Sequence, residues 1–173
     1  MKRILLAASA LIVVAATSSA FAEDGGNGNG NGKTNRATVT GTGQLTVFQP
    51  ITLAQTQGLD FGAITSGANG TVTIAQANGT RSVSGGVGAI AVNVGKTGAF
   101  DVKGQADAAI NVVVGSDITG FAGGIKGKTQ ADNLPVALKG SSASFNVGGS
   151  LDIPASTPAG AYTGEYTVSV NYP

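Results

Sequence analysis

The stretch ATVTGTGQLTVFQPITL, from Ala37 to Leu53, alternates small or apolar residues with threonine and other polar residues. Period-two alternation is typical of a strand with one buried face, and an ordinary strand needs only about 5–6 residues. The stretch is therefore too long for one strand at the start of a folded region. We interpret residues 35–43 as an N-terminal extension and residues 44–53 as the first strand of the domain that follows, bent at Pro50 because proline cannot donate to a ladder.

The residues before this stretch have the pattern of an export signal. A basic start is followed by an apolar run and by the small-residue sequence Ala20-Phe21-Ala22, which predicts a signal peptide over residues 1–22. Because the apolar run is shorter than the roughly 20 residues of a spanning helix, we expect no membrane insertion after cleavage. Residues 23–34 are rich in glycine and asparagine and predict a flexible tether. The expected location is the periplasm, the cell surface or the extracellular space.

From residue 44 onward, short alternating runs are separated by turn residues, and no window has sustained helical spacing. Asn69-Gly70 and Asn78-Gly79 favour type I′ hairpin turns around a strand at residues 71–77. Strands at intervals of about 8–12 residues indicate a sandwich or barrel. We therefore predict one all-β domain over residues 44–173, an immunoglobulin-like antiparallel β-sandwich. Its further expected strands are residues 89–94, 99–103, 109–114, 134–138, 143–147, 151–153 and 162–172.

The side-chain inventory argues against catalysis. The chain contains no histidine and no cysteine, so the commonest general base, the thiolate nucleophile and the usual transition-metal ligands are missing. The carboxylates are isolated in sequence. Asp101, Asp107 and Asp117 could ligate calcium, but they lack ligand spacing, and the phosphate-loop-like GGIKGKT at residues 123–129 is interpreted as a plain loop. We expect no enzyme activity, no cofactor and no metal.

The charge of the chain argues against nucleic acid as a partner. Once Lys2 and Arg3 leave with the signal peptide, eight basic residues face nine acidic ones, and the chain has no tryptophan. Nucleic-acid binding needs a basic footprint and aromatic stacking platforms. We therefore expect no nucleic-acid partner.

Four segments carry a family resemblance: PITLAQTQGLDFG (50–62), AFDVKG (99–104), FNVGGSLDI (145–153) and AGAYTGEYTVSVNY (159–172). With them, the chain resembles the proteobacterial exported proteins catalogued as domain of unknown function 4402. Its layout is similar to that of chaperone–usher pilins and spore-coat-like secreted proteins. In such pilins the sandwich lacks its last strand, and the extension of the next subunit fills the groove. This chain departs from that pattern because it has no disulfide and because its extension has few bulky side chains.

The resemblance implies a strand donor and a strand acceptor. On the last expected strand, even-numbered residues from Tyr162 to Tyr172 are mostly apolar and odd-numbered ones are polar, and no strand-forming stretch follows to pair with that edge. An uncovered edge invites pairing with an added strand. The expected donor residues are Ala37, Val39, Gly41, Gly43 and Leu45, and the expected acceptor residues are Tyr166, Val168, Val170 and Tyr172.

The implied function is a structural one: a non-enzymatic pilin-like or surface-coat subunit that self-associates head-to-tail, with a periplasmic chaperone as the other expected partner. Two alternatives stay open. The extension would bind weakly as a donor, because it offers only Val39 at the size of valine or leucine unless Leu45 and Val47 join it. It could instead fold back onto its own domain in cis and give a monomer, since topology rules permit both. Alternatively, the chain could be a monomeric binding module that presents the loop 117–132 to a carbohydrate or a protein.

Overall fold

The computed structural model describes residues 38–65 and 67–173. The expected signal peptide and tether, and Ala37 of the expected extension, lie outside the described residues. The chain divides into two units, of which the second runs from Gln44 to Pro173.

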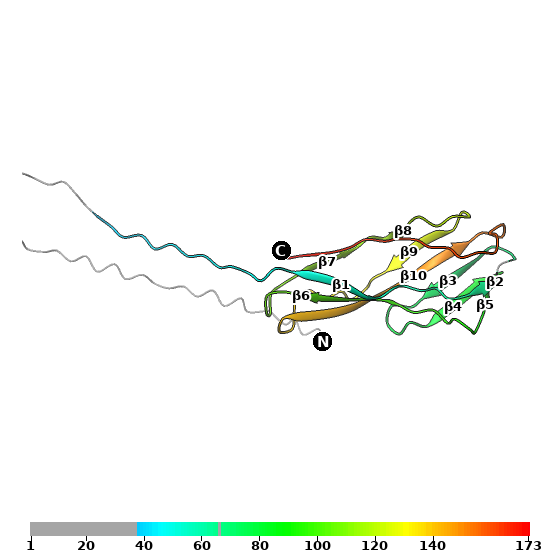
Figure 1. The fold of residues 1–173 in the computed structure, drawn as a ribbon, viewed down its shortest axis with the longest axis horizontal. Coiled ribbons are helices and arrows are strands. Elements are labelled where there is room, and N and C mark those ends of the chain that lie inside the picture. The colour runs from blue at the N-terminus through cyan, green and yellow to red at the C-terminus, as the bar shows by residue number, and fades with distance from the viewer. Residues whose placement is uncertain (1–37, 66) are drawn as a thin grey trace, which may run out of the picture. The chain divides into compact units, whose positions relative to one another are not determined.

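The unit Gln44–Pro173 is an all-β structure of antiparallel sheets that curl into a half-barrel (Figure 1). The described residues contain no helix, and all their strand pairs are antiparallel. The predicted all-β class is thus confirmed. The strands are β1 (Thr52–Gln57), β2 (Ile64–Thr65), β3 (Gly70–Ile74), β4 (Arg81–Gly85), β5 (Gly88–Ala89), β6 (Gly98–Lys103), β7 (Asn111–Val114), β8 (Asp117–Ile118), β9 (Lys126–Gln130), β10 (Ser142–Ile153) and β11 (Val168–Asn171).

The 12-residue strand β10 organises the largest sheet. Its first half pairs with β6, and its second half lies between β3 and β9. The sheet runs in the order β1-β6-β10-β3-β4, and β9 and β8 extend it from the other edge of β10. We expected two strands here, at residues 143–147 and 151–153. They are one strand because Gly148 and Gly149 stay in the ladder, where neighbouring backbone leaves no room for a Cβ.

The core consists of two hydrophobic clusters, one under each half of β10. The first contains Phe145 and Val147 with Phe100, whose ring stacks on Phe145 at 5.4 Å between centroids. The second contains Leu151 and Ile153 with Val72. Alternate residues of one strand thus enter two clusters, as period-two alternation requires.

The pair Asn78-Gly79 lies in the connection of the hairpin formed by β3 and β4, as the sequence predicted. Gly79 has a φ of 69° and lies in the connection, where the Asn78 side chain accepts a 3.0 Å hydrogen bond from the Thr80 amide. The connection is longer than the predicted two-residue type I′ turn, and Asn78 does not adopt a positive φ. Gly70 opens β3, and the Asn69 side chain accepts a hydrogen bond from the Ala155 amide.

Two strand predictions and one loop prediction were wrong. Beyond Ala89, residues 90–94 form a loop because the carbonyls of Ile90 and Asn93 accept hydrogen bonds from the Arg81 guanidinium. Residues 134–138 form only an isolated bridge, because Pro135 lacks the N–H that a ladder needs. Lys126–Gln130, predicted as a loop, is β9: its Gly127 lies too close to Ile118 and Leu151 for any side chain.

The first strand also begins later than predicted. We expected residues 44–53, whereas β1 starts at Thr52, directly after Gln49-Pro50-Ile51. Proline cannot donate to the ladder with β6, so pairing starts beyond it. Residues 44–51 are outside any strand, with Leu45 at 86% and Val47 at 77% exposure.

Candidate functional site: a groove between two strand edges

The C-terminal segment has the alternation expected of it. Each even-numbered residue from Tyr162 to Tyr172 is half-buried and each odd-numbered one is exposed. Tyr166, Val168, Val170 and Tyr172 all pack against the first core cluster. The expected acceptor residues therefore lie together on the inner face of one extended segment.

One edge of this segment is paired and the other is not. Val168–Asn171 pairs with β7, and among the described residues it has no second partner. The Gly115 amide donates to the Thr167 carbonyl, and Glu165 exchanges two hydrogen bonds with Thr119. Because hydrogen-bonded and non-bonded pairs alternate in antiparallel ladders, the odd-numbered residues use their backbone groups toward β7. The even-numbered residues direct theirs toward the other edge.

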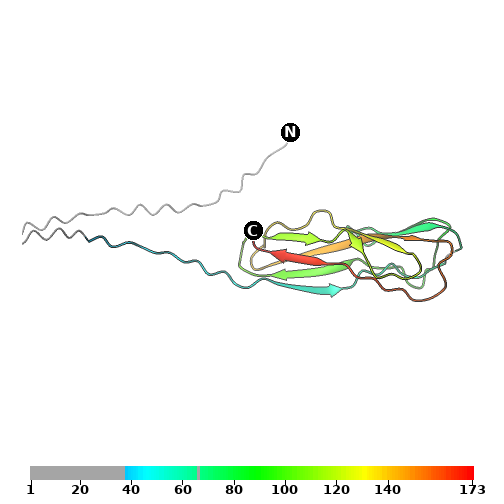
Figure 2. The same cartoon turned by 90° about the horizontal axis from the view of Figure 1, so that it is seen from above.

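Strand β1 provides a second such edge. It pairs with β6, and the described residues contain no strand on its other side. Leu53 of β1 packs on the first core cluster together with Val168 and Val170. In Figure 2 β11, in red, points toward the end of the domain where β1, in cyan, begins. The two edge strands thus run in opposite directions.

Two cavities form a groove along these edges. One, of about 440 Å³, lies between Leu53 and Gln55 of β1 and Val168 of β11, with Phe100 at its base. The other, of about 540 Å³, continues toward the far end of the domain. Gly164 and Tyr166 line both cavities. The larger cavity is mostly apolar, and its aromatic lining residues are Phe61, Phe121, Tyr162 and Tyr166.

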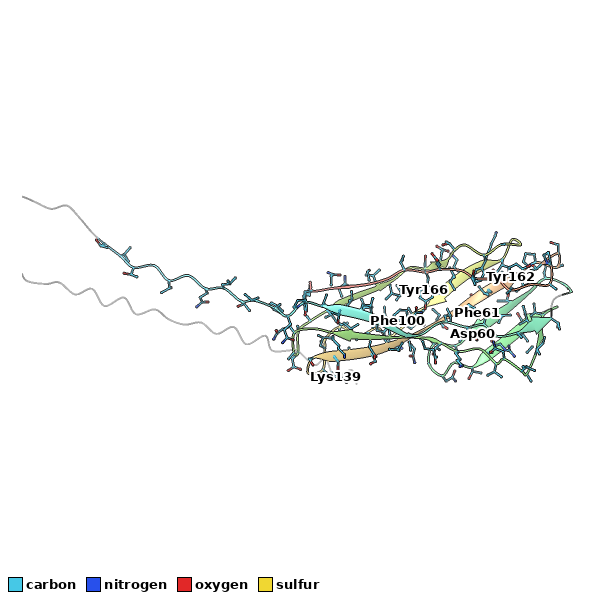
Figure 3. The ribbon with its side chains drawn as sticks, in the orientation of Figure 1. Asp60, Phe61, Phe100, Lys139, Tyr162 and Tyr166 are labelled. Carbon is cyan, nitrogen blue, oxygen red and sulfur yellow. The ribbon has the colours of Figure 1, made fainter. Side chains whose placement is uncertain are left out.

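Tyr166 lies where the two cavities meet, since it lines both. Its ring meets Phe100 edge-on at 6.2 Å between centroids, and its hydroxyl approaches Gly98 of β6 so closely that a side chain there would collide with it. Figure 3 shows Tyr166 between Phe100 and Phe61 along the domain. Its hydroxyl is buried without a hydrogen-bond partner in the described structure, and burial raises the pKa of the Tyr166 phenol above its usual 10.0. Tyr166 therefore places a large, half-buried ring where the two cavities share their lining.

A second tyrosine reaches across the end of the groove. The Tyr172 hydroxyl accepts a hydrogen bond from the Gln105 amide at 2.7 Å and donates one to the Gln49 carbonyl at 2.8 Å. The Phe48 ring packs on Tyr172 at 5.3 Å between centroids. These contacts fix the point at which the chain enters β1, beside the end of β11.

The expected donor residues lie outside every strand. Val39, Gly41 and Gly43 belong to the first unit and are exposed, with Val39 at 90%. Leu45 is exposed at the start of the second unit. Ala37 lies outside the described residues, so the structure gives no placement for it. The described donor residues all present their side chains to solvent.

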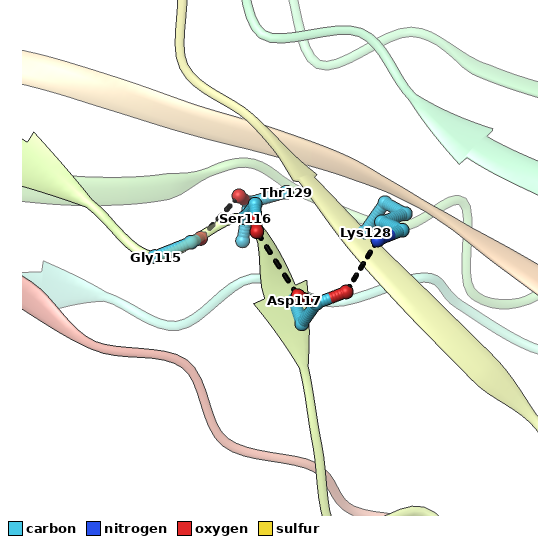
Figure 4. A network of polar contacts seen from close by, with 5 residues as sticks. All are labelled: Gly115, Ser116, Asp117, Lys128 and Thr129. Atoms are coloured by element: carbon cyan, nitrogen blue, oxygen red, sulfur yellow. Dashed lines mark hydrogen bonds and ion pairs between the residues drawn. The ribbon is translucent and has the colours of Figure 1, made fainter.

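The carboxylates considered for metal binding are held in separate local contacts. Asp101 accepts from the Ser144 hydroxyl, and Asp107 accepts from the Gly140 amide. Asp117 pairs with Lys128 and accepts from Ser116 (Figure 4), and these contacts, with the Lys128 hydrogen bond first, lower the pKa of its carboxyl. Within residues 38–65 and 67–173, no three acidic side chains gather as a metal site would need.

Sequence reasoning missed the far half of the groove. It chose residues on the closing strand alone, whereas Phe61 and Phe121 come from loops. The LDFG stretch at residues 59–62 carried a signal for them, since Leu59 and Phe61 alternate with Asp60 and both pack on the second core cluster. For Phe121, no comparable signal exists in the sequence.

An antiparallel all-β domain with a groove between two strand edges is the class that these observations define. The family model described as "Domain of unknown function (DUF4402)" matches residues 51–172, so the chain belongs to that family. Comparison with curated proteins and with solved structures gives no match. In the part of the chain that the structure describes, no helix has the length and apolar character to cross a membrane.

Proposed function

We propose that this protein is an exported, non-enzymatic structural subunit with an immunoglobulin-like, pilin-like domain, and that it assembles head-to-tail by β-strand addition. The observation that carries the proposal is the groove between β1 and β11, which exposes one backbone edge on each side and apolar side chains at its base. A strand added between two such edges gains backbone hydrogen bonds on both sides and buries alternate side chains.

The N-terminal extension of a second copy has the properties that the added strand needs. Its residues alternate in the period that a groove of this kind requires, and its large apolar side chains, Val39, Leu45 and Val47, are exposed. Full burial of a side chain of this size contributes about 1.5–3 kcal/mol. A donor with three such side chains gives an assembly that depends on protein concentration, because association itself costs several kcal/mol.

The entry into β1 favours addition in trans over addition in cis. To reach its own groove beside β1, the extension would have to reverse direction at Gln49-Pro50. The residue before a proline is biased toward extended backbone, and the Gln49 carbonyl is held by the Tyr172 hydroxyl. A reversal there would break this contact and the packing of Phe48 on Tyr172.

Deletion of residues 35–42 tests the proposal. We expect the mature wild-type chain to form oligomers that grow with concentration, and the deleted chain to stay a folded monomer by size-exclusion chromatography with light scattering. Deletion of residues 24–31, which removes the same length from the tether, should leave the oligomers unchanged. Oligomers of unchanged size after deletion of residues 35–42 would contradict the proposal.

A monomeric binding module is the second candidate. The aromatic side chains in the larger cavity favour it, because aromatic faces stack on apolar or sugar-like ligands. A wild-type chain that stays monomeric at high concentration and binds a glycan would support this candidate instead. Electron microscopy of the producing cells would separate a surface polymer from a periplasmic monomer.

A further inference from the structure

The inward-facing residues of the extension match the floor of the groove in one register. We propose that residues 38–47 of a second copy lie antiparallel to residues 162–171, with Gly43 paired with Tyr166 and Leu45 paired with Gly164. This inference rests on the proposed strand addition and specifies its direction and register.

The direction follows from the anchored entry into β1. An antiparallel donor leaves the groove near Tyr162, at the end of the domain away from Gln49, and the Phe48–Gln49 anchor of the second copy follows within two residues. A donor that ran in the opposite direction would leave the groove beside Tyr172, where the Phe48 ring of the first copy already packs. The antiparallel direction therefore brings different ends of the two copies together, and such a contact does not close on itself.

Tyr166 limits which donor residue can lie above it. Its ring lines both cavities, and its hydroxyl already lies against the β6 backbone at Gly98. A donor residue paired with Tyr166 shares the groove with this large ring, so we place a residue without a side chain there. Within the inward-facing series of the extension, only Gly41 and Gly43 meet this condition.

The surroundings of Gly164 indicate which of these two glycines pairs with Tyr166. It lines both cavities, and the Phe121 ring packs so closely on it that a side chain at this position would collide with the ring. With Gly43 paired with Tyr166, Leu45 is paired with Gly164 and can pack on the Phe121 ring. With Gly41 paired with Tyr166, a glycine would face Gly164, and the ring would gain no apolar partner from the donor.

The outward faces match in the same register. Each polar residue of the donor then lies opposite a polar residue of the acceptor, and cross-strand pairs of threonine, serine and amide side chains are favourable. These pairs are Thr38 with Asn171, Thr40 with Ser169, Thr42 with Thr167, Gln44 with Glu165, and Thr46 with Thr163.

Disulfide trapping tests the register directly, because the natural chain has no cysteine. Thr40 and Ser169 would form a non-hydrogen-bonded pair, since the acceptor edge uses its even-numbered backbone groups. The side chains of such pairs are the closer ones, within the reach of a disulfide. With oxidised glutathione as the oxidant, the double variant T40C/S169C should give a covalent ladder on a non-reducing gel.

Three matched pairs are the controls. T40C/T167C and T40C/N171C report registers shifted by two residues, and T40C/T163C reports a parallel donor. Each should give less than a tenth of the ladder of T40C/S169C. A stronger ladder from any of them would overturn the proposed register or direction and leave strand addition intact. A faster-migrating monomer from T40C/S169C would overturn the second copy as donor, because it would show a disulfide within one chain.

Two glycine variants give a readout that needs no cysteine. G43V should raise the concentration at half-assembly at least tenfold, because valine collides with Tyr166. G41V should raise it less, because its donor position faces Val168. Equal effects of the two variants would contradict the register. If neither variant changes assembly and deletion of residues 35–42 is also without effect, strand addition itself is wrong.

Discussion

The Tyr172 hydroxyl donates a 2.8 Å hydrogen bond to the carbonyl of Gln49, a residue 123 positions earlier in the chain. The same hydroxyl accepts from the Gln105 amide. One phenol thus joins the end of β11 to the entry of β1 and to the loop after β6. The contact closes one end of the domain and fixes where the extension begins.

Replacing Tyr172 by phenylalanine should loosen this end. The variant Y172F keeps the ring packing with Phe48 and loses both hydrogen bonds. We expect the free energy of unfolding, measured by urea denaturation, to fall by about 1–3 kcal/mol, because each of the two bonds contributes about 0.5–1.5 kcal/mol net. Limited proteolysis between residues 44 and 50 should become faster.

The matched control for Y172F is Y162F. The Tyr162 hydroxyl donates only to the Pro158 carbonyl, four residues away, at an exposed site. Its loss should change stability by less than that of Tyr172 and should not expose residues 44–50 to proteases. Equal effects of the two variants would show that the long-range bond has no special role.

Truncating Phe145 should be much more damaging. Phe145 is 7% exposed, and its ring stacks on Phe100 in the first core cluster. F145A should lower the free energy of unfolding by about 3–5 kcal/mol, through lost burial and the cavity left behind. V92A, at a residue that is 94% exposed, should stay within about 0.5 kcal/mol of wild type.

The alternation of apolar and polar residues predicted the faces of the closing segment correctly, because side-chain direction in an extended chain depends only on local geometry. Boundaries were less predictable. The same alternation runs through residues 44–50, yet no strand forms there, since whether a strand forms depends on a partner edge and on Pro50. Lys126–Gln130 shows the converse: its two lysines and a glycine indicate a loop, but pairing with both β8 and β10 makes it a strand.

The candidate groove was predictable on one side only. The alternation of apolar and polar residues over 162–172 indicated the inner face of that segment. The role of β1 as the second edge, and of Tyr166 as a lining residue of both cavities, depends on contacts between residues that are far apart in the sequence. No local pattern encodes such contacts.

The two glycines of the segment GLDFG should differ sharply in their tolerance of alanine. Gly62 has a φ of 76°, and a Cβ there would collide with the Arg81 guanidinium and the Asn93 carbonyl. G62A should cost at least about 1–2 kcal/mol from the left-handed backbone alone. G58A, where the added methyl meets nothing within 4 Å, should be neutral or slightly stabilising. Thermal unfolding of both variants checks the contrast, and similar melting temperatures would contradict it.

The ion pair between Asp117 and Lys128 should be visible in a pH titration. Lys128 and Ser116 hold the pKa of the Asp117 carboxyl below its usual 3.8, so the folded state favours the charged form. The stabilising contribution is present above the unfolded pKa and is lost as pH falls through the folded pKa. Carbon-detected NMR titration of K128M should show the Asp117 pKa rising toward its usual value, and an unchanged pKa would contradict the assignment.

Tyr166 should give the opposite dependence, at alkaline pH. Burial raises the pKa of its phenol above 10.0, because the groove disfavours the phenolate. A raised folded pKa means that the contribution of Tyr166 to stability is complete below about pH 10 and is lost as pH rises through the folded pKa.

The variant Y166F removes the ionisable group, and it loses no hydrogen bond because none of the described residues partners the hydroxyl. At pH 8 the variant should be as stable as wild type or more stable, since it removes an unpaired buried polar atom. Its advantage over wild type in urea denaturation should grow between pH 9 and pH 11. An advantage that stays constant over this range would show that the Tyr166 phenol reaches solvent freely, and the floor of the groove would then be less enclosed than its contacts with Gly98 and Phe100 imply.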